Sequence, residues 1–131
     1  MGKPAAKQGD RVTATDVHLI VPPSGGPPVP TPHDFSGLLD GGLSRNVRIM
    51  GRPAATTGST VTNLPPHLPV GGSFATPPSN RGTVAAGSPT VFINGRAAAR
   101  DGDQVTTCND PVDAPVGKVA ATGTVKIGER R

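Results

Sequence analysis

Hydrophobic and polar residues alternate in two short segments of the chain, each of which ends at a glycine. Val47-Arg48-Ile49-Met50-Gly51 and Val91-Phe92-Ile93-Asn94-Gly95 share the pattern Val-x-Ile-x-Gly. A period of two predicts a β-strand, and the glycine predicts a turn after it. We therefore expect two short strands, each followed by a tight turn.

A longer motif follows both segments directly and occurs a third time near the start of the chain. The copies cover residues 3–13, 52–62 and 96–106, with the pattern [KR]-[PA]-Ala-Ala-x-x-Gly-[DS]-x-Val-Thr. The Ala-Ala pair predicts a second strand, the glycine a second turn, and Val-Thr a return to extended structure. Each unit is predicted to be a small β-meander, and its threefold use predicts a repeat fold.

The first copy has no alternating segment before it, and the missing strand is found at the other end of the chain. Val125-Lys126-Ile127-Gly128 resembles the two segments above, and Gly117–Ala121 resembles Gly82–Ala86, which precedes the third motif. We therefore expect a closing strand at about 119–128 to complete the first unit, which leaves fewer open sheet edges. The predicted fold is one all-β domain over residues 1–131, with pseudo-threefold symmetry and both termini in one region.

Long segments rich in proline and glycine follow the first two motifs. They cover residues 21–32 and 64–72, whereas the third motif is followed by the shorter segment 108–111. Because proline fixes φ, these segments are expected to be stiff loops. The only weak indication of a helix is a single turn over residues 35–40.

Composition alone favours disorder, because the 131 residues include 18 glycines and 16 prolines and lack tryptophan and tyrosine. The repeat argues against disorder, since a disordered chain has no need to keep an apolar position in register three times. A small core is commonly supplemented by disulfides, a metal or oligomerisation. The single cysteine, Cys108, excludes an internal disulfide. A metal ion or a partner protein is therefore expected.

Charge and hydropathy argue against two classes of partner. The formal net charge is +4, the basic residues are scattered, and three phenylalanines are the only aromatic side chains of the Phe, Trp and Tyr class, so we do not expect nucleic-acid binding. Neither a signal peptide nor a membrane span is visible. We expect synthesis in the cytoplasm and export only by a dedicated machine.

All three histidines and the cysteine lie in the segments that follow the motifs. His18 and His67 each come six residues after the valine of a Val-Thr pair, Cys108 comes three residues after the third such valine, and His33 ends the first proline-rich segment. In a threefold body these positions converge near one axis. Three imidazoles and one thiolate form a tetrahedral ligand set for zinc, and iron can use the same ligands. The ordinary alternative is that the histidines lie on the surface and the cysteine is a small buried hydrophobe.

A closed four-ligand site has no open position for water or substrate, which predicts a structural metal and no catalytic residue. A zinc-dependent hydrolase is the alternative. Asp34, which is adjacent to His33, would then be the candidate base.

The three motifs resemble the PAAR repeats of the tip proteins of contractile injection systems. The resemblance rests on Lys3–Ala6, Arg52–Ala55 and Arg96–Ala99, although the first and third copies carry mild departures from the family pattern. It implies a small cone-shaped β-rich body with a threefold base, long Pro/Gly-rich loops and zinc near the apex. The zinc ligands that it implies are His18, His33, His67 and Cys108.

The resemblance also implies a function without chemistry, as the cap of a trimeric β-helical spike. The spike would be VgrG-like or of the phage-baseplate kind, in a type VI secretion system or a related phage-tail-like particle. A monomer with three similar units can offer a similar edge to each spike subunit, and its strands could continue the sheets of the spike. Sheath contraction would then carry the tip through the target membrane, out of the cell or into another one. The alternative within the same machine is an adaptor that attaches effectors.

Overall fold

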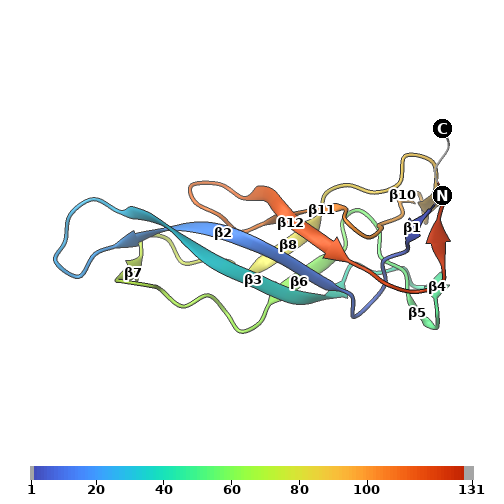
Figure 1. Cartoon of the computed structure of the whole chain (residues 1–131), viewed down its shortest axis with the longest axis horizontal. Helices are drawn as coiled ribbons and strands as arrows, with labels where there is room; N and C mark the ends of the chain where they lie inside the picture. Colours follow the sequence, from blue (N-terminus) through green and yellow to red (C-terminus); the bar gives the residue numbers. More distant parts are fainter. Residues whose placement is uncertain (1, 129–131) are drawn as a thin grey trace.

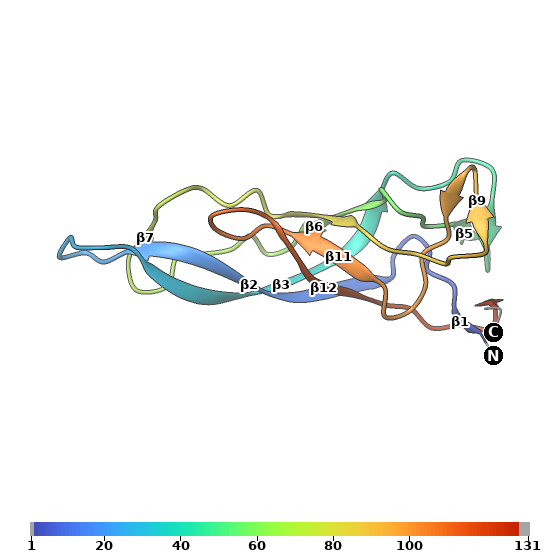
Figure 2. The same cartoon turned by 90° about the horizontal axis from the view of Figure 1, so that it is seen from above.

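The computed structural model describes residues 2–128, and within that range it contains strands and no helix. Accordingly, no helix in this part of the chain is long and apolar enough to cross a membrane. The body is elongated (Figures 1 and 2) and narrows from the end that holds β1 and β13 toward the loop between β2 (Arg11–Val21) and β3 (Val29–Gly41). The all-β prediction is confirmed.

Three two-stranded hairpins form the broad end, which we call the base. They are β4 (Arg48–Ile49) with β5 (Arg52–Pro53), β9 (Phe92–Ile93) with β10 (Arg96–Ala97), and β13 (Lys126–Ile127) with β1 (Lys3–Pro4). The registers are equivalent, since Ile49 faces Arg52, Ile93 faces Arg96 and Ile127 faces Lys3. The C-terminal β13 thus pairs with the N-terminal β1 in the first unit, and the range 119–128 contains the end of β12 (Ala114–Ala120) and all of β13 as two separate strands.

Backbone hydrogen bonds join the three units in a closed ring around the pseudo-threefold axis. The N–H of Ala6 donates to the carbonyl of Ala99, that of Ala99 to Ala55, and that of Ala55 to Ala6, over distances of 2.9 to 3.0 Å. The three alanines are at most 1 % exposed. The Ala-Ala of the motif therefore has a steric reason, because the backbones approach too closely at the axis for a larger side chain.

The Gly-Asp or Gly-Ser step of each motif is a turn closed by a side chain. Asp10 Oδ2, Ser59 Oγ and Asp103 Oδ2 each accept the backbone N–H three residues earlier in the chain, at 2.7 to 3.0 Å. The glycine before each acceptor has a φ between 83° and 91°, a conformation that side chains disfavour. The motif therefore requires a glycine followed by a short acceptor side chain.

Six strands close into a barrel next to the base. In spatial order they are β12 (Ala114–Ala120), β11 (Gln104–Thr107), β8 (Arg81–Val84), β6 (Thr60–Asn63), β3 and β2, with β12 also paired to β2. Val12, Val61 and Val105 are fully buried inside the barrel. Each faces a glycine of a neighbouring strand, namely Gly37, Gly82 and Gly117.

The predicted helical turn over residues 35–40 is wrong. These residues belong to β3, in which Phe35, Gly37 and Leu39 point inward and Ser36, Leu38 and Asp40 are more exposed. The segment is the first-unit counterpart of Gly82–Val84 and Gly117–Val119. Its backbone groups pair with β2 on one side and β6 on the other, so the sheet satisfies them better than an isolated helical turn would.

The proline-rich segment 21–32 is only partly a loop. Residues 22–28 connect β2 to β3, whereas Pro30 and Pro32 lie in β3, opposite Leu19 and Val17. The opposite edge of β3 pairs with β6 only from Gly37 onward. Proline is tolerated in this part of β3 because the strand has a free edge there. The long β2–β3 hairpin was not predicted.

Candidate metal centre

A cluster of polar side chains continues the barrel interior beyond its last aliphatic layer. β2 contributes Asp16 and His18, β3 contributes His33, the loop after β6 contributes His67, and Cys108 follows β11 directly. We call these five residues the polar cluster. All are buried, at most 8 % exposed, because strand alternation turns Asp16, His18 and His33 inward.

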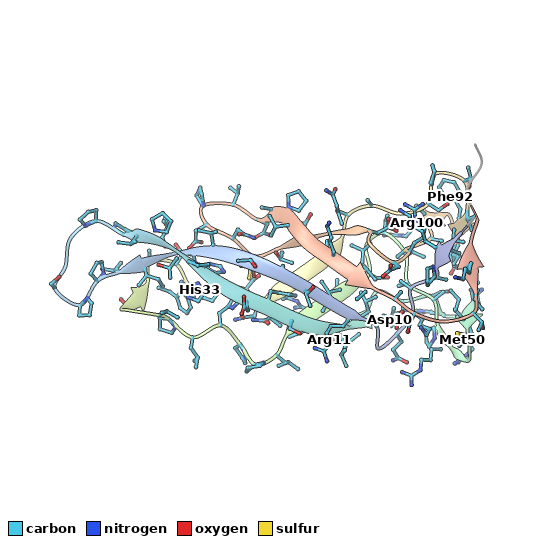
Figure 3. The ribbon with its side chains drawn as sticks, in the orientation of Figure 1. Asp10, Arg11, His33, Met50, Phe92 and Arg100 are labelled. Atoms are coloured by element: carbon cyan, nitrogen blue, oxygen red, sulfur yellow. The ribbon has the colours of Figure 1, made fainter. Side chains whose placement is uncertain are left out.

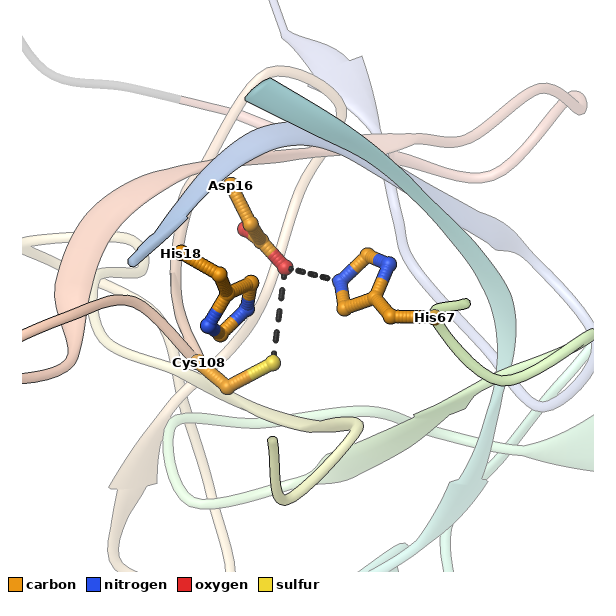
Figure 4. Close-up of side chains that lie close together, drawn as sticks. All are labelled: Asp16, His18, His67 and Cys108. Carbon is orange, nitrogen blue, oxygen red and sulfur yellow. Dashed lines mark hydrogen bonds and ion pairs between the residues drawn. The ribbon is translucent and has the colours of Figure 1, made fainter. Parts of the chain in front are cut away.

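The four predicted ligands lie together in this cluster. The ring centres of His18 and His67 are 5.1 Å apart, and His33 lies 5.6 Å and 5.5 Å from them. The donor atoms of Asp16, His18, His67 and Cys108 all lie within 4.8 Å of one another (Figure 4). This buried group can hold a metal ion, and it contains three of the four predicted ligands, with Asp16 in place of His33.

Ring nitrogens in the cluster lack the partners that buried polar atoms normally have. Within residues 2–128, no hydrogen bond reaches either nitrogen of His18 or Nε2 of His33. Nδ1 of His33 lies 2.9 Å from the carbonyl oxygen of Thr31, so it carries the proton and Nε2 keeps a free lone pair. Such an arrangement is typical of metal-binding histidines, and unpaired buried nitrogens are costly without a ligand. The residues therefore fit a metal ion.

The loop that carries Cys108 is bound to the free edge of β2. Asn109 Oδ1 and Asp110 Oδ2 accept the backbone N–H groups of Val17 and Leu19, at 2.7 Å and 2.8 Å. Asp110 Oδ2 also lies 3.4 Å from His18 Nδ1. The loop thus brings both the thiol and a carboxylate to the cluster.

Asn80 positions the loop that carries His67. Its Oδ1 accepts the backbone N–H of His67 at 2.8 Å and Nδ2 of Asn63 at 3.0 Å. On the outer side, Phe74 of β7 (Ser73–Phe74) packs against the rings of His18 and His33, with ring centres 5.8 Å and 5.5 Å away. A hydrogen bond from its backbone to Asn80 therefore positions His67, and the ring of Phe74 covers His18 and His33 on the outer side.

Residues 74–131 match the family model of the PAAR motif. This segment carries a PAAR motif, which is consistent with a PAAR-repeat protein. The match covers the third motif and the closing strand, and the first two motifs repeat the same backbone pattern. No protein of curated function matches the chain. The PAAR motif supports a spike-tip type of protein of contractile injection systems in general, and PAAR proteins are structural.

The side chain of Cys108 is almost completely shielded from solvent. Burial, and then the negative charge of Asp16, raise the pKa of Cys108 to about 11. Hydrogen bonds from the backbone of Asn80 and the hydroxyl of Ser79 act in the opposite direction. The metal-free protein therefore holds Cys108 as a thiol at neutral pH, and a bound cation would displace its proton.

Sequence reasoning missed Asp16, although it is fully buried inside the cluster. The available signal was strand alternation, which places Asp16 on the same face of β2 as His18. Asp34, the alternative base, does not join the polar cluster. It is exposed on the other face of β3.

The polar cluster lies in the narrow half of the body but not at its end. Figure 3 shows His33 part-way along the β2–β3 hairpin, and the hairpin continues to the loop 22–28. The apex is therefore proline-rich backbone, and the cluster lies behind it, where the loops of His67 and Cys108 meet the hairpin.

Proposed function

We propose that this protein is the cap of a trimeric spike in a contractile injection system, with the base bound to the spike and the narrow end pointing outward. The observation that carries the proposal is the base itself. Its three hairpins have equivalent registers around one axis, so one polypeptide offers a similar strand pair in three directions. A threefold partner is the natural match for such a surface.

The end face of the base has apolar side chains that support this orientation. Ile49, Ile93 and Ile127 are 6 to 9 % exposed and form one buried cluster with the first alanine of each motif pair: Ala5, Ala54 and Ala98. Around them Met50 and Phe92 are 51 % and 59 % exposed, and Figure 3 shows both at the broad end. Exposed apolar groups gathered on one face are typical of an interaction surface.

In this proposal the metal is structural. Zinc held by His18, His33, His67 and Cys108 would tie the loops of His67 and Cys108 to the β2–β3 hairpin, beyond the point where the other barrel strands end. Iron is compatible with the same donors. The metal would keep the narrow half folded while the tip breaches a target membrane, and no chemical step is required.

The route of the protein follows from this role. It would be made and assembled on the spike in the cytoplasm. Contraction of the sheath would then deliver it outside the cell or into a target cell.

Binding to a trimeric spike tests the proposal. We expect one copy of this protein per trimer of a candidate spike protein, measured by light scattering. Phe92→Glu should abolish binding without lowering the melting temperature, because Phe92 is exposed. Leu68→Glu is the matched control, since Leu68 is 75 % exposed in the narrow half. Equal binding by both variants, or no binding by the wild type, would count against the proposal.

An adaptor role has one observation in its favour. A groove beside the polar cluster is lined by Pro65, Pro66, Leu68 and Val70, and Leu68 and Val70 are exposed. If effectors bind there, Leu68→Glu should release them while spike binding persists. A zinc hydrolase would instead lose its activity in His67→Ala and bind hydroxamates at the metal.

A further inference from the structure

Asp16 is a fully buried carboxylate whose two oxygens have different surroundings. Oδ1 accepts a hydrogen bond from the hydroxyl of Thr107 and lies 3.4 Å from Asn109 Nδ2. Oδ2 lies 2.8 Å from His67 Nε2 and 3.5 Å from Cys108 Sγ (Figure 4). Oδ1 is thus anchored to the barrel wall, and Oδ2 is directed at the donors of the candidate metal centre.

We propose that Asp16 Oδ2 is a direct ligand of the metal, in addition to the imidazoles and the thiolate. Donors about 2.0–2.3 Å from one ion lie roughly 3–3.5 Å from their neighbours and at most about 4.5 Å from an opposite donor. The two Asp16 distances are close to the first range. The span of 4.8 Å for the four donor atoms is close to the second. A small contraction of the cluster is enough to surround one ion.

The charge of the centre gives an independent reason. A divalent ion bound by three neutral imidazoles and one thiolate leaves a net positive charge in a buried site, and burying an uncompensated charge is costly. The Asp16 carboxylate makes the ion and its direct ligands neutral together, whereas the carboxylate of Asp110 lies 3.4 Å from His18 Nδ1, outside that set. It also adds a hard oxygen donor, which favours Zn²⁺ or Fe²⁺ over the soft ion Cu⁺.

This inference rests on the proposed metal centre and is tested on the full chain. Metal-free wild type, Asp16→Asn and Asp34→Asn are titrated with Zn²⁺ against a competing chelator and, separately, with Co²⁺. Asp34→Asn is the matched control, because it removes the same charge beside His33 from an exposed position. We expect Asp16→Asn to weaken Zn²⁺ binding at least about 10- to 100-fold, the range that loss of even an indirect partner causes.

The Co²⁺ spectrum separates a ligand from a structural residue. In Asp16→Asn the ligand-field bands should shift and the thiolate-to-cobalt charge-transfer band should persist, because Cys108 still binds. Asp34→Asn should match the wild type in both measurements. An Asp16→Asn protein with wild-type Zn²⁺ affinity and an unchanged Co²⁺ spectrum overturns the inference but leaves the metal centre standing.

If Asp16→Asn does not fold, X-ray absorption of the wild-type zinc protein decides instead. One sulfur with four nitrogen or oxygen donors supports Asp16 as a ligand, whereas one sulfur with three donors that all show the multiple scattering of imidazole overturns it. A wild type that binds no Zn²⁺ overturns both this inference and the proposed metal centre. Spike binding by the base would then still be tested separately.

Discussion

The two halves of this molecule solve the same problem, a shortage of apolar side chains, in different ways. At the base and the axis, three equivalent units close one ring of backbone hydrogen bonds between alanines, and the valines of the barrel pack beside it. In the narrow half only β2 and β3 continue, and the space between the hairpin and two loops is filled by the polar cluster. Close packing of three equivalent backbones can stabilise the axis without large side chains. The narrow half lacks that symmetry and depends on contacts between its hairpin and loops.

This difference teaches where each half is sensitive. The base depends on close backbone approach, so added volume should harm it. The narrow half contains buried ring nitrogens that make no hydrogen bonds with one another or with their neighbours in the described part of the chain. Removal of the metal ion that they fit should therefore destabilise this half. Four changes can separate the two halves, and their expected effects decrease from loss of the metal to added volume at the axis.

Loss of the metal should have the largest effect. Cys108→Ala, or chelation of the wild type, should lower the free energy of unfolding by several kcal/mol, up to about 10, because structural zinc contributes folding energy directly. Hydrogen exchange should show loss of protection first in residues 64–72 and 108–113, with the amides of Ala6, Ala55 and Ala99 still protected. Chelator should not affect Cys108→Ala further. Simultaneous loss of protection in both halves would contradict the separation.

The ion pair of the third unit should come next. Asp103 accepts hydrogen bonds from the backbone N–H of Arg100 and from its guanidinium, at 2.7 to 3.1 Å, and both side chains are buried. Asp103→Ala should cost about 3–5 kcal/mol, because it leaves a buried cation without its carboxylate. The double variant Arg100→Thr with Asp103→Ser copies the second unit and should cost much less. Urea unfolding compares the two, and equal losses would disprove the reasoning.

The stability of the metal-free protein should depend on Cys108 at high pH. The folded-state pKa of about 11 lies above the ordinary value of 9.0, so the thiol contributes stability that is fully present below pH 9 and is lost as the pH rises through 11. A pKa difference of this size corresponds to at most about 3 kcal/mol in the free energy of unfolding. Urea unfolding between pH 8 and 12 measures the loss, and Cys108→Ala, which lacks this contribution, subtracts the titration of other groups. Identical pH profiles would refute the prediction.

Added volume at the axis should have the smallest effect of the four. Ala55→Val places two methyl groups where the backbones of three units meet, which should cost about 1–3 kcal/mol. Ala85→Val is the control, because Ala85 is exposed on the same barrel and should change stability by less than about 0.5 kcal/mol. Chelation should lower the stability of Ala55→Val and of wild type equally. A loss of metal affinity in Ala55→Val would show that the two halves are coupled.

Much of the base was predictable from the sequence. The Val-x-Ile-x-Gly segments and the three motifs predicted the hairpins, and the match between Val125–Ile127 and those segments predicted the closing pair with Lys3 and Pro4. Such features are visible because they are short, local and repeated. The prediction of a helical turn was wrong for Gly37–Leu39, the first-unit counterpart of Gly82–Val84 and Gly117–Val119. Its two leucines form a local apolar run, and its strand partners lie elsewhere in the chain.

The narrow half depended on contacts that no local pattern encodes. The sequence by itself determined the three-unit cycle and the set of histidines and cysteine that follow the motifs, since both depend on residue type and spacing. Only the tertiary structure decided that β2 and β3 form a long hairpin, that Asp16 is buried between His67 and Cys108, and that the apex lies beyond the cluster. The physical reason is that burial and ligand geometry come from loops of unequal length folding onto one hairpin, and their positions depend on long-range hydrogen bonds such as those of Asn80 and Asp110.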